Sequence, residues 1–190
     1  GLKNGGGGVY IALEESSSQI KKTALAHGWD LEKYEKSGKL VFINPDLMDV
    51  NPDKLLYQVV EAVNKTGAKR VILDSIYSLE SATMNRNKIR EFLIQFSGFL
   101  KTNGATSLLT YLSENSFGAE SGQLLGSGKA SELRLSSMVD GLILLRYVER
   151  ARRVEKLVNI LKIRGSAHDK RIWQFEVKKD GIKIGKVFKK

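Results

Sequence analysis

The sequence predicts an α/β fold, with a mostly parallel sheet flanked by helices and followed by a C-terminal antiparallel β-meander. Through residues 9–112, short apolar runs typical of buried strands alternate with amphipathic stretches of ten to sixteen residues. Such alternation is characteristic of parallel strands joined by right-handed helical crossovers. After Gly141 the helical period stops, and apolar runs follow one another with short turns between them. We therefore expect a single domain over residues 1–190.

Composition limits the class of protein. The chain has 190 residues, of which 42% are hydrophobic and 27% charged, as is ordinary for a soluble globular protein. No run approaches 18 apolar residues and no basic-then-apolar leader opens the sequence, so we expect neither a membrane span nor secretion. The absence of cysteine excludes disulfides and thiolate metal sites, and it fits a cytoplasmic location.

Local signals mark the elements of the first part of the chain. Ser16 can cap the helix that starts near Gln19, and Pro52 and Gly67 are typical of the two ends of a helix. In chain order we expect a flexible stub over 1–8, a strand over 9–15, helices over 19–27 and 31–36, a strand over 40–43, a helix over 52–66, a strand over 71–73, a helix over 86–101 and a buried strand over 107–112.

The second part of the chain changes character. Residues 113–137 combine glycine and serine with few apolar anchors, which predicts a mobile loop containing one short helix near residues 131–135. The meander then takes strands over 142–148, 154–163, 173–178 and 182–184, with a turn at 179–181.

Charge is distributed unevenly along the sequence. The net charge is +10, and residues 141–190 carry all of it, with 15 Lys and Arg against 5 Asp and Glu. A basic block of this kind suits nucleic acid, a nucleotide phosphate or an acidic face of a protein partner. It is equally compatible with a solvated surface that aids solubility.

Acidic residues end two of the expected strands. Asp74 closes the run over 71–73, and Glu14 and Glu15 close the run over 9–13. In open α/β sheets such positions place metal-binding and water-activating groups in one crevice. Asp74 can hold the water shell of a Mg²⁺ ion, and the adjacent glutamates repel each other, so that one can stay basic enough to polarise water. The alternatives are an Asp that begins a loop and a solvated pair at a helix N-terminus.

A phosphate-binding loop is absent from the 190 residues, because G-x-x-x-x-G-K-[ST] occurs nowhere. Residues 126–129 read Gly-Ser-Gly-Lys, but their spacing from Gly122 is one residue too long. Ala130 also stands where a metal-binding Ser or Thr is required. We interpret this segment as a chance likeness, or at most as a backbone loop that attracts anions.

Basic residues of the meander form two candidate groups. Lys162 and Arg164 alternate onto one strand face, where both can reach one phosphate group, or else form an exposed edge that discourages aggregation. Arg150, Arg152 and Arg153 mark a hairpin tip that is either solvated or in contact with a nucleic-acid backbone. The two histidines lie far apart in sequence and lack a carboxylate cluster, so we expect no zinc or iron site.

Several segments together resemble the KaiC-like branch of the RecA superfamily of ATPases. They are V-Y-I-A-L-E-E-S at 9–16, H-G-W-D at 27–30, G-K-L-V-F-I at 38–43, V-I-L-D-S at 71–75 and N-I-L-K-I-R-G-S-A-H at 159–168. The resemblance covers nearly all of residues 9–185 in the family's order. It implies a RecA-like sheet, ATP and Mg²⁺ as cofactors, and self-association into a hexamer-like ring.

The resemblance also assigns roles to individual residues. Glu14 and Glu15 match the catalytic carboxylate pair, and Asp74 matches the Walker B metal acid. Three further residues match groups that reach the neighbouring subunit's ATP, namely Lys162, Arg164 and His168. Ser113 and Glu114 resemble the strand-end polar pair, and residues 115–137 resemble the loop that faces the ring channel.

One departure from the family pattern matters for activity. The sequence resembles a member of this family that lacks the N-terminal Walker A strand and loop. That absence is either natural or introduced by design, with the glycine run taking the place of the deleted segment. In the superfamily the absent strand lies beside the strand over 107–112. We therefore expect little ATP hydrolysis by this chain alone, and a sheet that re-pairs or oligomerises. The alternative is a non-catalytic module that binds nucleic acid, or acts as a scaffold, through the basic block. Clock, signalling, motility and recombination roles all share this core.

Overall fold

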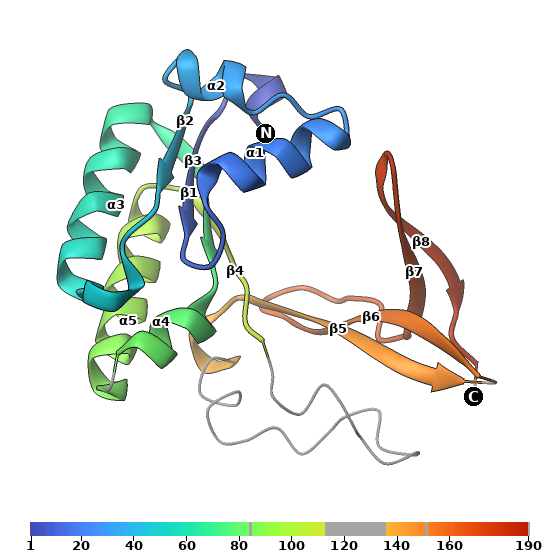
Figure 1. Ribbon diagram of the computed structural model, residues 1–190. Coiled ribbons are helices and arrows are strands. Elements are labelled where there is room, and N and C mark those ends of the chain that lie inside the picture. Colours follow the sequence, from blue (N-terminus) through green and yellow to red (C-terminus); the bar gives the residue numbers. More distant parts are fainter. Residues whose placement is uncertain (84, 113–135, 151, 190) are drawn as a thin grey trace. The chain divides into compact units, whose positions relative to one another are not determined.

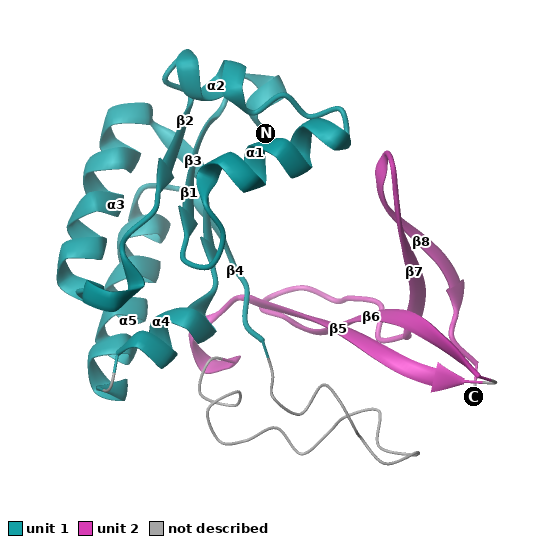
Figure 2. Ribbon diagram, viewed as in Figure 1, with its two compact units in different colours: residues 1–112 teal, residues 113–190 magenta. Residues whose placement is uncertain are grey.

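The computed structural model describes residues 1–83, 85–112, 136–150 and 152–189. The chain forms two compact units, Gly1–Leu112 and Ser113–Lys190 (Figure 2). Each unit has its own four-stranded sheet. The expectation of a single domain stays a prediction.

The first unit is built on a parallel sheet, which confirms the predicted α/β class. Its strands are β1 (Gly7–Ala12), β2 (Leu40–Ile43), β3 (Ala68–Asp74) and β4 (Thr106–Leu109). They lie in the order β2-β1-β3-β4, and every neighbouring pair is parallel (Figure 1). All four carboxyl ends therefore lie at the same end of the sheet, as the crossover connections require.

Helices flank this sheet. Figure 1 shows α3 and α5 side by side on one face and α1 on the other. The helical segments of the first unit are η1 (Leu2–Asn4), α1 (Ser17–Ala26), α2 (Glu32–Lys36), η2 (Leu47–Asp49), α3 (Pro52–Thr66), α4 (Ile76–Ala82) and α5 (Arg86–Thr102).

Caps explain where the longer helices begin and end. The Asn51 side chain accepts hydrogen bonds from the first turn of α3, Pro52 occupies its first position, and Gly67 ends it with a φ of 59°. The Ser16 hydroxyl caps α1 in the same way. These ends agree with the predicted ones because they depend on local chemistry.

The core lies between the sheet and the helices α3 and α5. Ile11 and Leu73 of the strands, Val59 of α3 and Phe96 of α5 are each 0% exposed. Burying one such side chain contributes about 1.5–3 kcal/mol. The central strands are therefore fixed by packing on residues that are distant in sequence.

Strand β4 differs from the buried strand predicted over 107–112. Its residues alternate between exposed and half-buried, and Leu108 is 56% exposed. Among the described residues β4 pairs only with β3, so it is an edge strand of its sheet. An edge strand has neighbours on one side only, and the apolar run alone does not distinguish it from a central strand.

The second unit is an antiparallel meander, as predicted. Its strands β5 (Gly141–Arg150), β6 (Arg153–Ile163), β7 (Trp173–Lys178) and β8 (Gly181–Val187) pair in chain order. Each neighbouring pair is antiparallel. Across the described parts of both units, no helix has the length and apolar character to cross a membrane.

Candidate functional site

The carboxyl ends of β1, β3 and β4 bring polar side chains together. Ala12, the last residue of β1, is paired with Asp74, the last residue of β3. Beyond the strands, the Leu13 N–H donates to the Asp74 carbonyl at 2.8 Å, and the Thr110 N–H donates to the Leu73 carbonyl at 3.1 Å. These backbone bonds hold the segments after the strands in register.

Asp74 has a hydroxyl donor on each carboxylate oxygen. The Tyr10 hydroxyl donates to Oδ2 at 2.9 Å, and the Thr110 hydroxyl donates to Oδ1. Burial, the hydrogen bond to Asp74 and its negative charge together raise the pKa of Tyr10 above its usual value, so the hydroxyl keeps its proton. The carboxylate is thus oriented by groups from two other strand ends.

Glu14 is held by two serines that follow β3. Its Oε1 accepts a 2.6 Å hydrogen bond from the Ser75 hydroxyl and a second one from the Ser78 hydroxyl. These two bonds lower the pKa of Glu14 and outweigh the opposing effect of its burial. Ser75 also caps α4, because its Oγ accepts the Ser78 N–H at 3.2 Å.

Glu15 lies in a different environment from Glu14. Its side chain is exposed, and its carboxylate has no hydrogen bond within the described residues. Its backbone carbonyl accepts a 3.1 Å bond from the Asn44 amide, which also donates to the Ala12 carbonyl at 3.1 Å. The structure thus separates the two glutamates into a tethered carboxylate and a free one.

The first unit supplies oxygen donors suited to magnesium but no closed protein cage. In the part of the chain that the structure describes, no three His, Cys, Asp or Glu residues group as metal ligands. Mg²⁺ is commonly held by one or two carboxylates, with waters and substrate phosphates completing its shell. Asp74, flanked by hydroxyls, fits that donor chemistry.

Four polar residues of this cluster were not predicted as site residues from the sequence. Tyr10, Ser75, Ser78 and Thr110 are ordinary strand, cap and loop residues in the sequence. A signal was available for Tyr10, because it shares a sheet face with Ala12 and so with Asp74 on the paired strand. For the others, the partner lies more than 30 residues away.

In the second unit, Lys162 and Arg164 come together on one short segment. The Lys162 ammonium donates to the carbonyls of Ser136 and Val139, the latter at 3.0 Å. The Arg164 guanidinium donates to the Ser137 carbonyl at 3.1 Å and forms a 3.2 Å ion pair with Asp140. Sequence reasoning grouped the two cations at this strand end, but it did not find these partners.

The remaining predicted site residues are less organised. His168 is half-buried beyond the end of β6. The hairpin between β5 and β6 pairs Arg150 with Arg153, and Arg152 has a φ of 62°. Arg150 donates to the Lys189 carbonyl at 2.6 Å. Ser113, Glu114 and the segments 115–135 and 126–129 lie outside the described residues.

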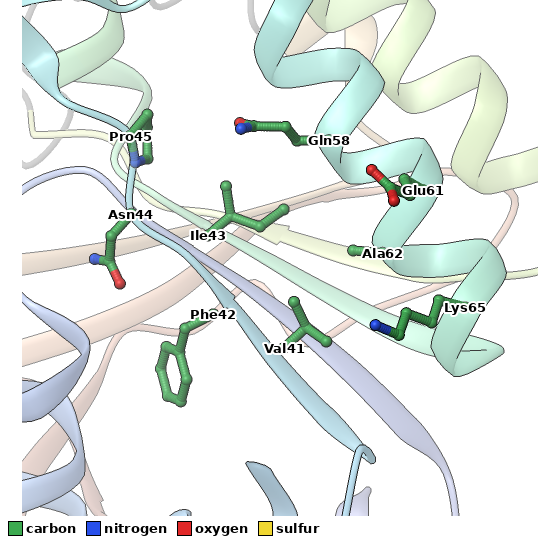
Figure 3. A pocket seen from close by; sticks show the side chains of 9 residues that line it. All are labelled: Val41, Phe42, Ile43, Asn44, Pro45, Gln58, Glu61, Ala62 and Lys65. Atoms are coloured by element: carbon green, nitrogen blue, oxygen red, sulfur yellow. The ribbon is translucent and has the colours of Figure 1, made fainter. Parts of the chain in front are cut away.

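A shallow groove of about 330 Å³ runs beside β2 (Figure 3). Val41 and Ile43 of the edge strand form one side of it, and Glu61 and Lys65 of α3 form the other. Apart from Asn44, none of the residues around the two glutamates lines it. The groove is therefore distinct from the carboxylate cluster.

Comparison with known proteins shows the family of the chain. The family model described as "ATPase: KaiC" matches residues 1–188. The circadian clock protein KaiC3 of Synechocystis sp. is 32% identical over 189 residues, which is all of this chain and 36% of that protein. The circadian clock oscillator protein KaiC of Acaryochloris marina is 28% identical over 186 residues, or 98% of this chain and 34% of that protein. The chain thus spans about a third of the length of these curated relatives.

A solved structure shows the same fold. It is the KaiC-like protein of the hyperthermophilic archaeon Pyrococcus horikoshii OT3, with a TM-score of 0.81 and 28% sequence identity. The match covers 97% of this chain and 78% of that chain. The RecA-like architecture and the family resemblance predicted from the sequence are both confirmed. This chain therefore belongs to the KaiC family of ATPases.

Proposed function

We propose that the chain is the ATP-hydrolysing core of a ring-forming KaiC-like ATPase. The observation that carries this proposal is the hydrogen-bonded cluster of Asp74 and Glu14 at the carboxyl ends of β1 and β3. Membership of an ATPase family supports the reaction class. The acidic cluster lies where open α/β sheets bind their ligands.

The residues of the cluster divide the work. Asp74 is the ligand for Mg²⁺, which supplies charge neutralisation on the phosphates of ATP when both are bound. Glu15 has the free carboxylate and is the better base for polarising water. One carboxylate oxygen of Glu14 already accepts hydrogen bonds from Ser75 and Ser78. A base needs an accessible lone pair within reach of the water, and Glu15 offers one.

The basic residues of the second unit act between subunits in this proposal. Lys162, Arg164 and His168 reach the ATP of a neighbouring subunit and stabilise charge on the transferring phosphoryl group. Lys162 and Arg164 rest on carbonyls of their own chain, so they must leave those partners to contact a phosphate. Self-association into a ring is therefore part of the proposed mechanism.

Turnover by these 190 residues alone is expected to be slow. The sequence contains no glycine-rich phosphate loop, and the described cluster is acidic, so it does not by itself cradle phosphates. Substantial Mg²⁺-dependent hydrolysis that survives purification and is lost in Glu14→Gln or Glu15→Gln would overturn this expectation. It would also show that the phosphate site is built in another way.

Calorimetry with ATP and Mg²⁺ tests the proposal, with the oligomeric mass measured by light scattering on the same sample. We expect nucleotide binding only in an assembly larger than one chain, where Lys162 and Arg164 of a neighbouring subunit supply the phosphate contacts. This binding should require Mg²⁺ and be lost in Asp74→Asn. Asp49→Asn is the matched control, because Asp49 is an exposed aspartate on η2 that is not among the hydrogen-bonded residues around Asp74. Equal Mg²⁺ dependence in wild type and Asp74→Asn would contradict the assignment of Asp74.

A second candidate function rests on the basic block. All of the net charge of +10 lies in residues 141–190, and Arg152 and Arg153 are exposed at the tip of the β5–β6 hairpin. These residues suit contact with a nucleic-acid backbone, or with an acidic protein face if the unit acts as a scaffold. Fluorescence anisotropy with a single-stranded DNA oligonucleotide tests the first use. Binding must weaken with salt and in the Arg152→Ala/Arg153→Ala variant, and salt-independent binding would contradict it.

A further inference from the structure

Both oxygens of the Asp74 carboxylate are held in place by protein hydroxyls. Tyr10 on β1 donates to one oxygen, and Thr110, directly after β4, donates to the other. The donors come from the strands on either side of β3, so the carboxylate is hydrogen-bonded from both neighbouring strands. We call this arrangement of Tyr10, Asp74 and Thr110 the hydroxyl clamp.

The position of Tyr10 explains why a long aromatic side chain is needed. Ala12 lies directly opposite Asp74, and its methyl group offers the carboxylate no hydrogen-bond donor. Tyr10 is two residues earlier on the same face, a diagonal separation of roughly 7–8 Å that only long side chains bridge. Its ring packs against Phe42 with centroids 5.6 Å apart, which holds the hydroxyl in place.

Thr110 is fixed independently of Tyr10. Its backbone N–H donates to the Leu73 carbonyl at 3.1 Å, so the residue continues the pairing of β4 with β3. A short hydroxyl side chain on so constrained a backbone has little freedom to move away. The clamp is therefore closed on one side by backbone pairing and on the other by ring packing.

Such a clamp affects divalent cations unequally. Ca²⁺ accepts carboxylates in monodentate or bidentate fashion within a flexible shell of six to eight oxygens. Mg²⁺ requires near-ideal octahedral geometry and keeps several waters. A carboxylate that donors hold at both oxygens cannot easily turn both towards one ion, which penalises the bidentate mode open to Ca²⁺.

We propose that Tyr10 is a specificity-determining residue, which holds Asp74 through the hydroxyl clamp so that the site prefers Mg²⁺ to Ca²⁺. The inference rests on the proposed function, since it takes Asp74 as the metal ligand. Tyr10 acts through Asp74 and is a positioning residue. It does not contact the reacting atoms in this scheme.

The test compares cation selectivity in wild type and Tyr10→Phe. Binding of a fluorescent ATP analogue to the full chain is measured while either Mg²⁺ or Ca²⁺ is titrated. Phenylalanine keeps the ring on Phe42 and removes only the hydroxyl. Loss of one hydrogen bond to a charged group corresponds to roughly tenfold in an equilibrium constant, so we expect the preference for Mg²⁺ over Ca²⁺ to fall by about that factor.

Two further variants serve as a control and as an independent test of the clamp. Tyr57→Phe removes a hydroxyl from an exposed tyrosine on α3 and should leave the selectivity unchanged. Thr110→Val opens the clamp from its other side and should shift selectivity in the same direction as Tyr10→Phe. It gives an answer even if Tyr10→Phe folds poorly.

Asp74→Asn separates this inference from the proposed function. Unchanged selectivity in Tyr10→Phe and Thr110→Val, with metal dependence lost in Asp74→Asn, overturns the clamp inference alone. Metal dependence that persists in Asp74→Asn, or a wild-type chain without nucleotide binding, overturns both. A general weakening for both cations at a constant ratio also contradicts the inference, because it indicates a purely structural role.

Discussion

The two units bury apolar strand residues to very different extents. In the first unit, Ile11 and Leu73 of the strands and Phe96 of α5 are inaccessible to solvent. In the second unit, Leu157 and Phe175 are the buried apolar side chains among residues 136–150 and 152–189. Elsewhere on its sheet, side chains such as Ile143 and Ile182 are about 60% exposed.

The difference teaches where a rigid site can be built. Parallel strands covered by helices have fixed carboxyl ends, and the hydrogen bonds around Asp74 and Glu14 depend on that rigidity. An antiparallel sheet with exposed apolar residues suits contact with another surface, which the cations of the second unit also favour. The first unit thus carries the chemistry of the proposed function, and the second carries its contacts.

The largest expected effect tests the contrast in burial directly. Phe96→Ala should lower the free energy of unfolding of the first unit by about 3–5 kcal/mol, because it leaves a cavity in a closed core. Ile143→Ala, on the exposed face of β5, should cost less than about 1 kcal/mol. Urea denaturation followed by tryptophan fluorescence measures both, since Trp29 lies in the first unit and Trp173 in the second. Similar losses for the two variants would break the comparison.

A smaller effect is expected where β1 meets β2 at the site. Asn44→Asp replaces an amide that donates to the carbonyls of Ala12 and Glu15 with a carboxylate that repels them. We expect a loss of about 1–3 kcal/mol in unfolding free energy. Asn64→Asp, an exposed position on α3, is the matched control and should be nearly neutral. Equal stability of the two variants would show that Asn44 does not hold the strand end.

A comparable hydrogen bond in the second unit should contribute less to the free energy of unfolding. Lys162→Met keeps much of the side-chain length but removes the donor to the carbonyls of Ser136 and Val139. Because the site is partly open to water, we expect a loss of about 1 kcal/mol. Hydrogen exchange of the amides of residues 136–140 measures the local effect, and Lys183→Met is the control on β8. Unchanged protection would contradict the assigned role of Lys162.

The sequence predicted most element boundaries because the chemistry that sets them is local. Asn51, Pro52 and Gly67 delimit α3 within a single stretch of chain, and the acidic end of β3 follows from the run over 71–74. Strand β1 ends at Ala12, so the two glutamates lie beyond it and do not end the strand. The seven-residue helix α4 was missed because it is too short for an apolar period to develop. The exposure of β4 was missed because strand order is a tertiary property.

The different environments of Glu14 and Glu15 could not be predicted from the sequence. Glu14 and Glu15 are neighbours with the same side chain, and they differ only in what folding brings to each. Glu14 receives Ser75 and Ser78, which lie 61 and 64 residues away, and Glu15 receives no side-chain partner within the described residues. Chain-distant hydroxyls leave no periodic signal in a sequence, so only the folded geometry separates the two roles.

The smallest expected effect concerns pH, and it sharpens the comparison of the glutamates. Folding lowers the pKa of Glu14 from 4.5, so the stability that its ionised form contributes is present above about that pH. It is lost as the pH falls through the lowered value, because the unfolded chain then binds the proton more readily. Since Glu14 is exposed, solvent screening limits the contribution to about 0.5 kcal/mol.

Urea midpoints of the first unit measured between pH 6 and pH 3 test this expectation. The wild type should lose slightly more stability on acidification than Glu14→Gln. The Ser75→Ala/Ser78→Ala variant keeps the carboxylate but removes both donors, so it should show the same reduced pH dependence as Glu14→Gln. If Glu14→Gln retained the full pH dependence, the hydroxyls would not be holding the ionised carboxylate. The two glutamates would then be equivalent, and the assignment of Glu15 as the base would lose its physical basis.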